Sequence, residues 1–150
     1  GITMITTDEQ PREAIDISGE NNLVENNYIA GFDDRGIVVD GNGADNNQII
    51  NNVITGGVDY SSNDKGGIFL RNADDTLIVG NVIAQNNMDG ISMQRSKRTM
   101  IAHNTIANNA NGQTRTKTCK TTRHACRKMC ISVIGSVASA LNSKQNSAIQ

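Results

Sequence analysis

Apolar and polar residues follow a pattern that recurs along most of the chain. One six-residue motif has an apolar residue first, an Asn fourth and an Ile last. Two apolar residues separated by one position precede each copy, and a Gly precedes three of these four pairs. Because the side chains of a strand alternate between its two faces, each unit predicts a turn, a strand, a bend and a second strand. The motif occurs as VENNYI at 24–29, IINNVI at 49–54, IVGNVI at 78–83 and IAHNTI at 101–106, after the pairs Ile15/Ile17, Ile37/Val39, Ile68/Leu70 and Ile91/Met93.

The spacing of these units indicates a solenoid. Equivalent residues recur after 22 to 31 positions, which is too short for a strand-helix-strand crossover and suits one coil of a β-helix. Each strand would pair with its equivalent in the next coil, about 4.8 Å away, so that identical residues form columns. Columns of Ile and Val would then fill the interior.

The Asn of the motif falls at the bend, where backbone groups lose their strand partners. A carboxamide both donates and accepts hydrogen bonds, so it can bind the local backbone and the next Asn of its column together. The motif therefore predicts an internal ladder, and the residue before each ladder Asn should face outward. The ladder would contain Asn27, Asn52, Asn81 and Asn104.

This pattern resembles the right-handed parallel β-helix proteins of the pectate lyase-like superfamily, which carry stacked aliphatic residues and internal Asn ladders. The resemblance covers residues 15–109. It implies an all-β fold, a right-handed parallel β-helix (solenoid) of about four to five short coils, and an extracellular or periplasmic location. It implies less about activity, because the superfamily includes pectate and alginate lyases, polysaccharide hydrolases, mannuronan epimerases, phage tailspikes and adhesins.

Charge divides the chain into two regions. Residues 1–112 hold 15 acidic residues and 7 Lys or Arg, whereas residues 113–150 hold 7 Lys or Arg and no acid. We therefore predict β-helix coils in 1–112 and a basic, Cys-containing tail in 113–150. No run of about 18 apolar residues occurs, so the sequence predicts no membrane span.

The tail has two interpretations. The repeat stops after Asn109, and the following residues either cap the open end of the solenoid or are foreign to the fold. At the other end, GITMIT at 1–6 resembles the second strand of an earlier coil, with Thr3 at the ladder position. Open ends of a solenoid need covering, which predicts flanking coils or a homo-oligomer.

The tail contains two further candidate features. Its Cys and His residues match no closed zinc spacing that we can justify. Its basic run at 115–128 lacks the interleaved aromatic residues of a nucleic-acid platform, so we predict nonspecific electrostatics and no nucleic-acid partner. The four metal-type ligands are Cys119, His124, Cys126 and Cys130.

Outward residues of the first strand form the candidate site. Asp40, Arg71 and Gln94 fall in one column, and Phe69 lies in the neighbouring column. In the lyases that the chain resembles, acidic residues on such a face hold calcium against uronate carboxylates, and an Arg or Lys takes a proton from the sugar. The resemblance thus implies a catalytic role for Arg71 and substrate binding by Asp40, Phe69 and Gln94. The alternative is a structural ion pair between Asp40 and Arg71, worth roughly 0.2 to 1 kcal/mol.

Two long loops lie beside this face. The loops at 40–48 and 55–67 are longer than their equivalents in the other coils, and insertions often carry function. The second loop supplies two further catalytic candidates: Tyr60 could stack on a sugar, and Lys65 could act as a base or bind a carboxylate. A solvated loop without function is the alternative.

Acidic residues in the turns are the candidates for a metal site. The turns contain Asp33, Asp34, Asp74, Asp75 and Asp89, and carboxylates are calcium ligands. The same sequences, DDRG and MDG, are also ordinary turn sequences. The cofactor is therefore left open, with calcium as the candidate and no defined metal-ligand set. His103 lacks a partner at ligand spacing and should be a surface residue in the second strand.

These observations predict a carbohydrate-active β-helix that acts on an acidic polysaccharide, by lyase or epimerase-like chemistry, or a piece of such a protein. The alternative is a noncatalytic carbohydrate-binding or structural solenoid, as in tail fibres and adhesins. Formation of unsaturated uronate from alginate or pectate would identify a lyase.

Overall fold

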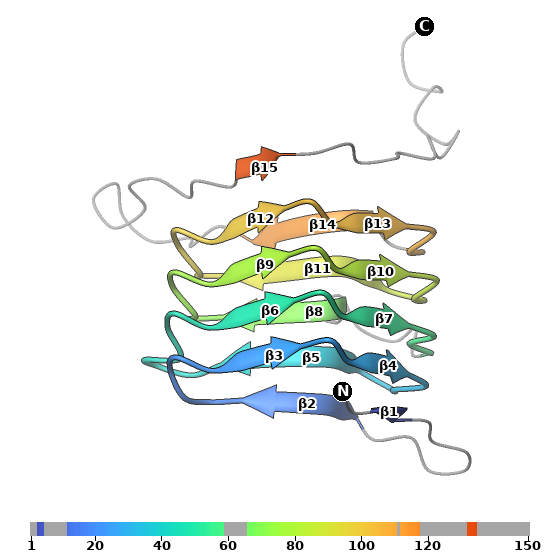
Figure 1. The fold of residues 1–150 in the computed structure, drawn as a ribbon, viewed down its shortest axis with the longest axis horizontal. Coiled ribbons are helices and arrows are strands. Elements are labelled where there is room, and N and C mark those ends of the chain that lie inside the picture. The colour runs from blue at the N-terminus through green and yellow to red at the C-terminus, as the bar shows by residue number, and fades with distance from the viewer. Residues whose placement is uncertain (1–2, 5–11, 59–65, 111, 118–131, 135–150) are drawn as a thin grey trace, which may run out of the picture.

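The computed structural model describes residues 3–4, 12–58, 66–110, 112–117 and 132–134. Within these ranges the chain forms parallel strands and no helix. The coils stack on one another, and each passes in turn through three parallel sheets (Figure 1). We call them the first, second and third sheets in the order in which a coil visits them. None of the described residues belongs to a helix with the length and apolar character to cross a membrane.

Each sheet contains one strand from each coil. The first sheet has the longest strands: β2 (Glu13–Ile17), β5 (Arg35–Asp40), β8 (Gly66–Arg71), β11 (Asp89–Gln94) and β14 (Gly112–Lys117). The second contains β3 (Leu23–Glu25), β6 (Gln48–Ile50), β9 (Leu77–Val79), β12 (Met100–Ala102) and β15 (Ser132–Ile134). The third contains β1 (Thr3–Met4), β4 (Tyr28–Ala30), β7 (Val53–Thr55), β10 (Val82–Ala84) and β13 (Thr105–Ala107).

This architecture confirms the predicted parallel β-helix. The coils contain three strands rather than two, because the six-residue motif itself spans two short strands. In the motif at 49–54, β6 ends at Ile50, Asn51 and Asn52 form the bend, and β7 begins at Val53. The apolar columns fill the interior as predicted, and Ile37, Ile54 and Ile78 are among the fully buried residues.

The Asn ladder is present at the corner between the second and third sheets. The Nδ2 of Asn52 donates to the Oδ1 of Asn81 at 3.0 Å, and the Nδ2 of Asn81 donates to the Oδ1 of Asn104 at 2.9 Å. The Nδ2 of Asn81 also donates to the carbonyls of Ile49 and Val79. Asn27 donates to Asn52 in the same way, so the ladder ties four coils together through buried and half-buried side chains.

The residue before each ladder Asn turns the corner. Asn51 is exposed, as predicted, and has a left-handed backbone with φ of 54°. Gly80 and His103 occupy the same place in later coils, with φ of 71° and 53°. His103 thus lies at the bend between β12 and β13, not within a strand as predicted, although it is exposed as expected.

Two further ladders occupy the other corners. Asn22 donates to Asn47 at 3.1 Å between the first and second sheets, and Asn86 donates to Asn109 at 2.9 Å where the third sheet leads back to the first. Each of the three corners of the solenoid therefore has at least one Asn–Asn hydrogen bond between coils.

Both chain ends continue the sheets. β14 pairs with β11 and β15 pairs with β12, so strands occur beyond residue 113. The sequence SVIGS at 132–136 also repeats the LIVGN pattern at 77–81. At the other end, Thr3 pairs with Tyr28 rather than with Asn27, so its predicted ladder position is wrong by one residue. The predicted boundary at 113, and the choice between cap and foreign extension, stay predictions because 118–131 and 135–150 lie outside the described residues.

Candidate functional site

The predicted site residues from the strands do lie together on the outer face of the first sheet. Strand register places Asp40 beside Arg71 and Arg71 beside Gln94, on β5, β8 and β11. Phe69 lies two positions before Arg71 on β8 and faces the same side, because residues two apart in a strand point the same way. Tyr60 and Lys65 fall in 59–65, outside the described residues, so their roles stay predictions.

Asp40 binds Arg71 through both oxygens of its carboxylate. The Nε of Arg71 donates to Oδ1 at 2.8 Å, and its Nη2 donates to Oδ2. This hydrogen bonding raises the pKa of Arg71 above its ordinary value. A guanidinium held in its charged form suits carboxylate binding and does not suit proton abstraction. The side chain of Arg71 is still 46% exposed and reaches solvent.

The ring of Phe69 is covered by two arginine side chains and is not available to a ligand. Its exposure is only 1%. The guanidinium carbon of Arg35 lies 4.7 Å from the ring centroid, and that of Arg71 lies 6.0 Å from it. Arg35 is in turn held by Glu13, whose Oε1 accepts a hydrogen bond at 2.7 Å. A direct contact between Phe69 and a sugar would therefore require rearrangement of its cover.

Sequence reasoning missed Arg35 because a glycine interrupts the alternation next to it. A Cβ on Gly36 would lie 2.6 Å from the carbonyl oxygen of Gly67 and from Cγ2 of Ile54. Gly36 therefore faces the crowded interior, and the strand register passes directly from Arg35 to Ile37. As a result, Arg35 points outward although it is two positions from the buried Ile37.

β11 carries buried polar atoms on this outer face. Ser92 and Gln94 lie beside Phe69 and Arg71 in the strand register. Within the described part of the chain, the Oγ of Ser92 and the Nε2 of Gln94 are buried and have no hydrogen-bond partner. Such groups are uncommon in folded proteins, so they are candidates for a role beyond stability.

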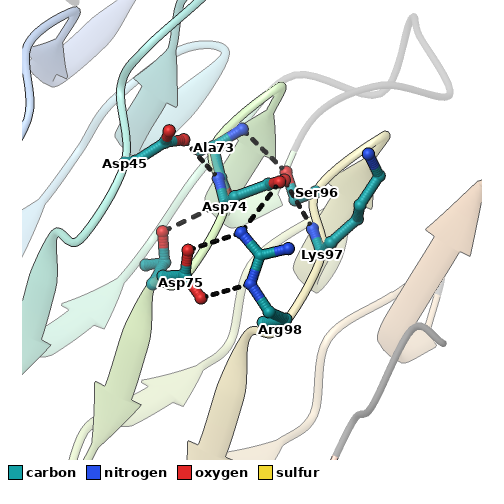
Figure 2. Close-up of polar contacts among 8 residues, drawn as sticks. Asp45, Ala73, Asp74, Asp75, Ser96, Lys97 and Arg98 are labelled. Atoms are coloured by element: carbon teal, nitrogen blue, oxygen red, sulfur yellow. Dashed lines mark hydrogen bonds and ion pairs between the residues drawn. The ribbon is translucent and has the colours of Figure 1, made fainter. Parts of the chain in front are cut away.

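A second charged cluster occupies the corner between the first and second sheets (Figure 2). Arg98 donates to both carboxylate oxygens of Asp75 at 2.6 Å and to Asp74 at 3.3 Å. The carboxylate of Asp45 accepts a hydrogen bond from the backbone N–H of Asp74, and the carboxylate of Asp74 accepts one from the backbone N–H of Lys97. The acidic turn predicted as a calcium candidate is thus filled by an arginine and by backbone donors.

The other predicted metal ligands do not form a site among the described residues. The carboxylate of Asp34 binds Arg12, and Asp89 is buried on β11. The described ranges contain no group of three or more His, Cys, Asp or Glu side chains able to hold a metal ion. The tail ligands Cys119, His124, Cys126 and Cys130 lie outside the described residues.

Comparison with known proteins relates the fold to two periplasmic proteins. A family profile described as "Periplasmic copper-binding protein (NosD)" matches residues 4–123. A search of curated proteins found no match. Among solved structures, the chain is similar to "Crystal Structure of the periplasmic alginate epimerase AlgG", with a TM-score of 0.62 and 20% identity. The match covers 81% of this chain and 29% of the epimerase, so the chain spans less than a third of that protein.

The family description names copper, so the described residues should offer copper ligands if they form such a site. Copper prefers imidazole, thiolate and thioether ligands. In the described ranges His103 stands alone at an exposed corner, Met88 and Met93 pack in the core, and no group of three or more His, Cys, Asp or Glu side chains could hold a metal ion. The described residues therefore do not fit a copper site.

Proposed function

Because the chain belongs to the NosD family and shares its β-helix with an alginate epimerase, we propose that it binds an acidic polysaccharide outside the cytoplasm. The binding surface is the outer face of the first sheet, centred on Arg71. The observation that carries this proposal is the state of Arg71, which is fixed by Asp40 and is still about half exposed. A pre-positioned guanidinium loses little freedom when it binds a carboxylate.

The ligand class follows from the chemistry of this face. Nη1 of Arg71 has no hydrogen-bond partner among the described residues, so it remains available to a carboxylate. Arg35 also contacts the Phe69 ring, but its charge is paired with Glu13. Arg71 is therefore the cation that this proposal uses. A polymer with a carboxylate on each sugar would satisfy this arrangement, whereas a neutral polysaccharide would leave the exposed guanidinium without an anionic partner.

Catalysis is the finer part of the proposal. A base would remove the proton from the carbon next to the uronate carboxylate, and the electron pair would pass into that carboxylate. Arg71 would neutralise the developing charge. Return of a proton to the opposite face gives epimerisation, whereas loss of the glycosidic oxygen gives a lyase product. Lys65 or Tyr60 would act as the base, since the raised pKa of Arg71 makes it unsuitable.

A noncatalytic solenoid is the second candidate. Two of the hydrogen-bond donor groups of Arg71, Nε and Nη2, are already used by Asp40, as in a purely structural ion pair. Residues 1–112 also carry an excess of eight negative charges, 15 acidic against 7 basic residues, which opposes binding of a polyanion at long range. This reading predicts no binding of any uronate polymer.

The test is to incubate the protein with alginate and pectate and to measure three quantities. Titration calorimetry reports binding, ultraviolet absorbance reports unsaturated uronate, and proton NMR reports epimerised residues. We expect binding that weakens as salt is added, because salt screens charge over about 10 Å at 0.1 M. Arg71→Lys should bind poorly, since an ammonium cannot reproduce the planar guanidinium contact. Absence of binding to every uronate polymer at low salt would refute the proposal.

A further inference from the structure

Two polar side chains on β11 differ in how a ligand could reach them. Ser92 is completely buried, and its neighbour in the register is the covered Phe69. Gln94 is only partly buried, and its register neighbours are the half-exposed Arg71 on β8 and Lys117 on β14. Both have a buried polar atom without a partner in the described part of the chain. Of the two residues, only Gln94 is partly exposed.

Arg71 alone would give a poorly selective site. A guanidinium binds any accessible carboxylate, so it recognises charge and not the identity of a sugar. Selectivity for a sugar requires a donor or acceptor that pairs with its hydroxyl groups, because a buried polar group left unpaired penalises analogues that lack them. The amide of Gln94 has both a donor end and an acceptor end.

We propose that Gln94 determines the sugar specificity of this face, by donating a hydrogen bond from Nε2 to a hydroxyl group of the uronate whose carboxylate binds Arg71. The inference rests on the proposed function. Register places the two side chains on adjacent strands, about 4.8 Å apart at the backbone, so they reach one sugar residue together. The last side-chain torsion of Gln is soft, so the amide can turn its unpaired donor toward a ligand.

The experiment compares alginate oligosaccharides with polyacrylate, which carries carboxylates and no hydroxyl groups. Affinities for both polymers are measured at one salt concentration for the wild type, Gln94→Met, Ser92→Ala and Arg71→Ala. Gln94→Met keeps the length of the side chain and removes the donor. Ser92→Ala is the matched control, since it removes the other unpaired polar atom of the same strand face. Circular dichroism and melting temperature confirm that each variant is folded.

We expect Gln94→Met to weaken alginate binding by about 10-fold, the effect of one lost hydrogen bond to a ligand, and to leave polyacrylate binding unchanged. Ser92→Ala should raise the melting temperature, because an unpaired buried hydroxyl is removed, and should leave the alginate preference intact. Arg71→Ala should weaken binding of both polymers.

Two results would overturn the inference while the proposed function survives. One is an unchanged alginate preference in Gln94→Met. The other is an equal loss of preference in Ser92→Ala, which would point to general packing of β11. A wild-type protein that binds neither polymer would refute the proposed function itself, and the specificity role with it.

Discussion

The Asn ladder and the outer face of β11 both contain buried polar atoms, yet within the described ranges those of the ladder are hydrogen-bonded and those of Ser92 and Gln94 are not. In the ladder, the amide of Asn81 donates to two carbonyls and to Asn104, and it accepts from Asn52. On the outer face, Ser92 and Gln94 have buried polar atoms without partners in the described structure.

This difference separates residues that define the fold from Gln94, whose amide donor is unpaired in the described part of the chain and can serve a ligand. A buried amide with all its partners favours one arrangement of the coils, because any other arrangement would leave it unpaired. A buried donor without a partner contributes nothing to the fold and costs free energy. Local conflicts of this kind are expected at functional sites.

The largest expected effect is on the ladder side of this comparison. Asn81→Leu should destabilise the protein by about 3 kcal/mol, because it removes the acceptor of the buried Asn52 backbone N–H and the side-chain hydrogen bond from Asn81 to Asn104. Chemical denaturation with circular dichroism measures the change. Asn51→Gly is the control: it removes an exposed Asn and keeps a residue suited to positive φ, so its effect should be a few tenths of a kcal/mol. An equal loss of unfolding free energy in the two variants would show that the ladder hydrogen bonds do not stabilise the fold.

A smaller loss is expected at the corner itself. Gly80→Ala should cost about 1 to 2 kcal/mol, since Gly80 has a left-handed backbone with φ of 71°. A Cβ there would also clash with Oδ1 of Asn51. The double variant Asn51→Gly/Gly80→Ala should recover part of this loss, because it removes the clash and leaves the backbone strain. If the stability losses of the two single variants simply add in the double variant, the clash between the new Cβ and Asn51 does not contribute.

The charged corner should give the smallest effect and one that depends on pH. Hydrogen bonding to Arg98 lowers the pKa of Asp75 below its ordinary value of 3.8. A lowered folded-state pKa stabilises the protein above the unfolded value, and this stabilisation disappears as the pH falls through the folded pKa. Asp75→Asn should therefore lower the melting temperature slightly at neutral pH and not at pH values well below 3.8. An equal difference at both pH values would exclude ionisation of Asp75 as the cause.

The sequence predicted one ladder and missed two. The motif at the corner of the second and third sheets was visible because Ile residues flank each Asn at fixed spacing. The other ladders contain Asn22 and Asn47, and Asn86 and Asn109, in loops that differ in length between coils. The repeated Asn-Asn pairs at 21–22, 46–47 and 108–109 were the available signal. The first Asn of each pair takes the left-handed conformation, and the second is buried at Asn47 and Asn109.

The sequence predicted which residues lie on the candidate face, but it did not predict the contacts between them. Strand alternation and coil spacing suffice to place Asp40, Arg71 and Gln94 in one column. They cannot show that Arg35 covers Phe69, because the irregular strand at Gly36 hides the outward orientation of Arg35. Whether a donor such as the Nε2 of Gln94 finds a partner depends on side-chain geometry, which periodicity does not contain.

The most direct test of the account is thermal melting of the wild type, Arg71→Ala and Asp40→Ala, each with and without saturating alginate. A ligand that binds the native state raises the melting temperature. We predict a rise for the wild type, a rise for Asp40→Ala because its guanidinium remains, and none for Arg71→Ala, whose melting temperature without ligand should stay within a few degrees of the wild type. A small loss of stability shared by both variants, with no effect of alginate on any of the three proteins, would contradict the account and leave Asp40 and Arg71 as a structural ion pair.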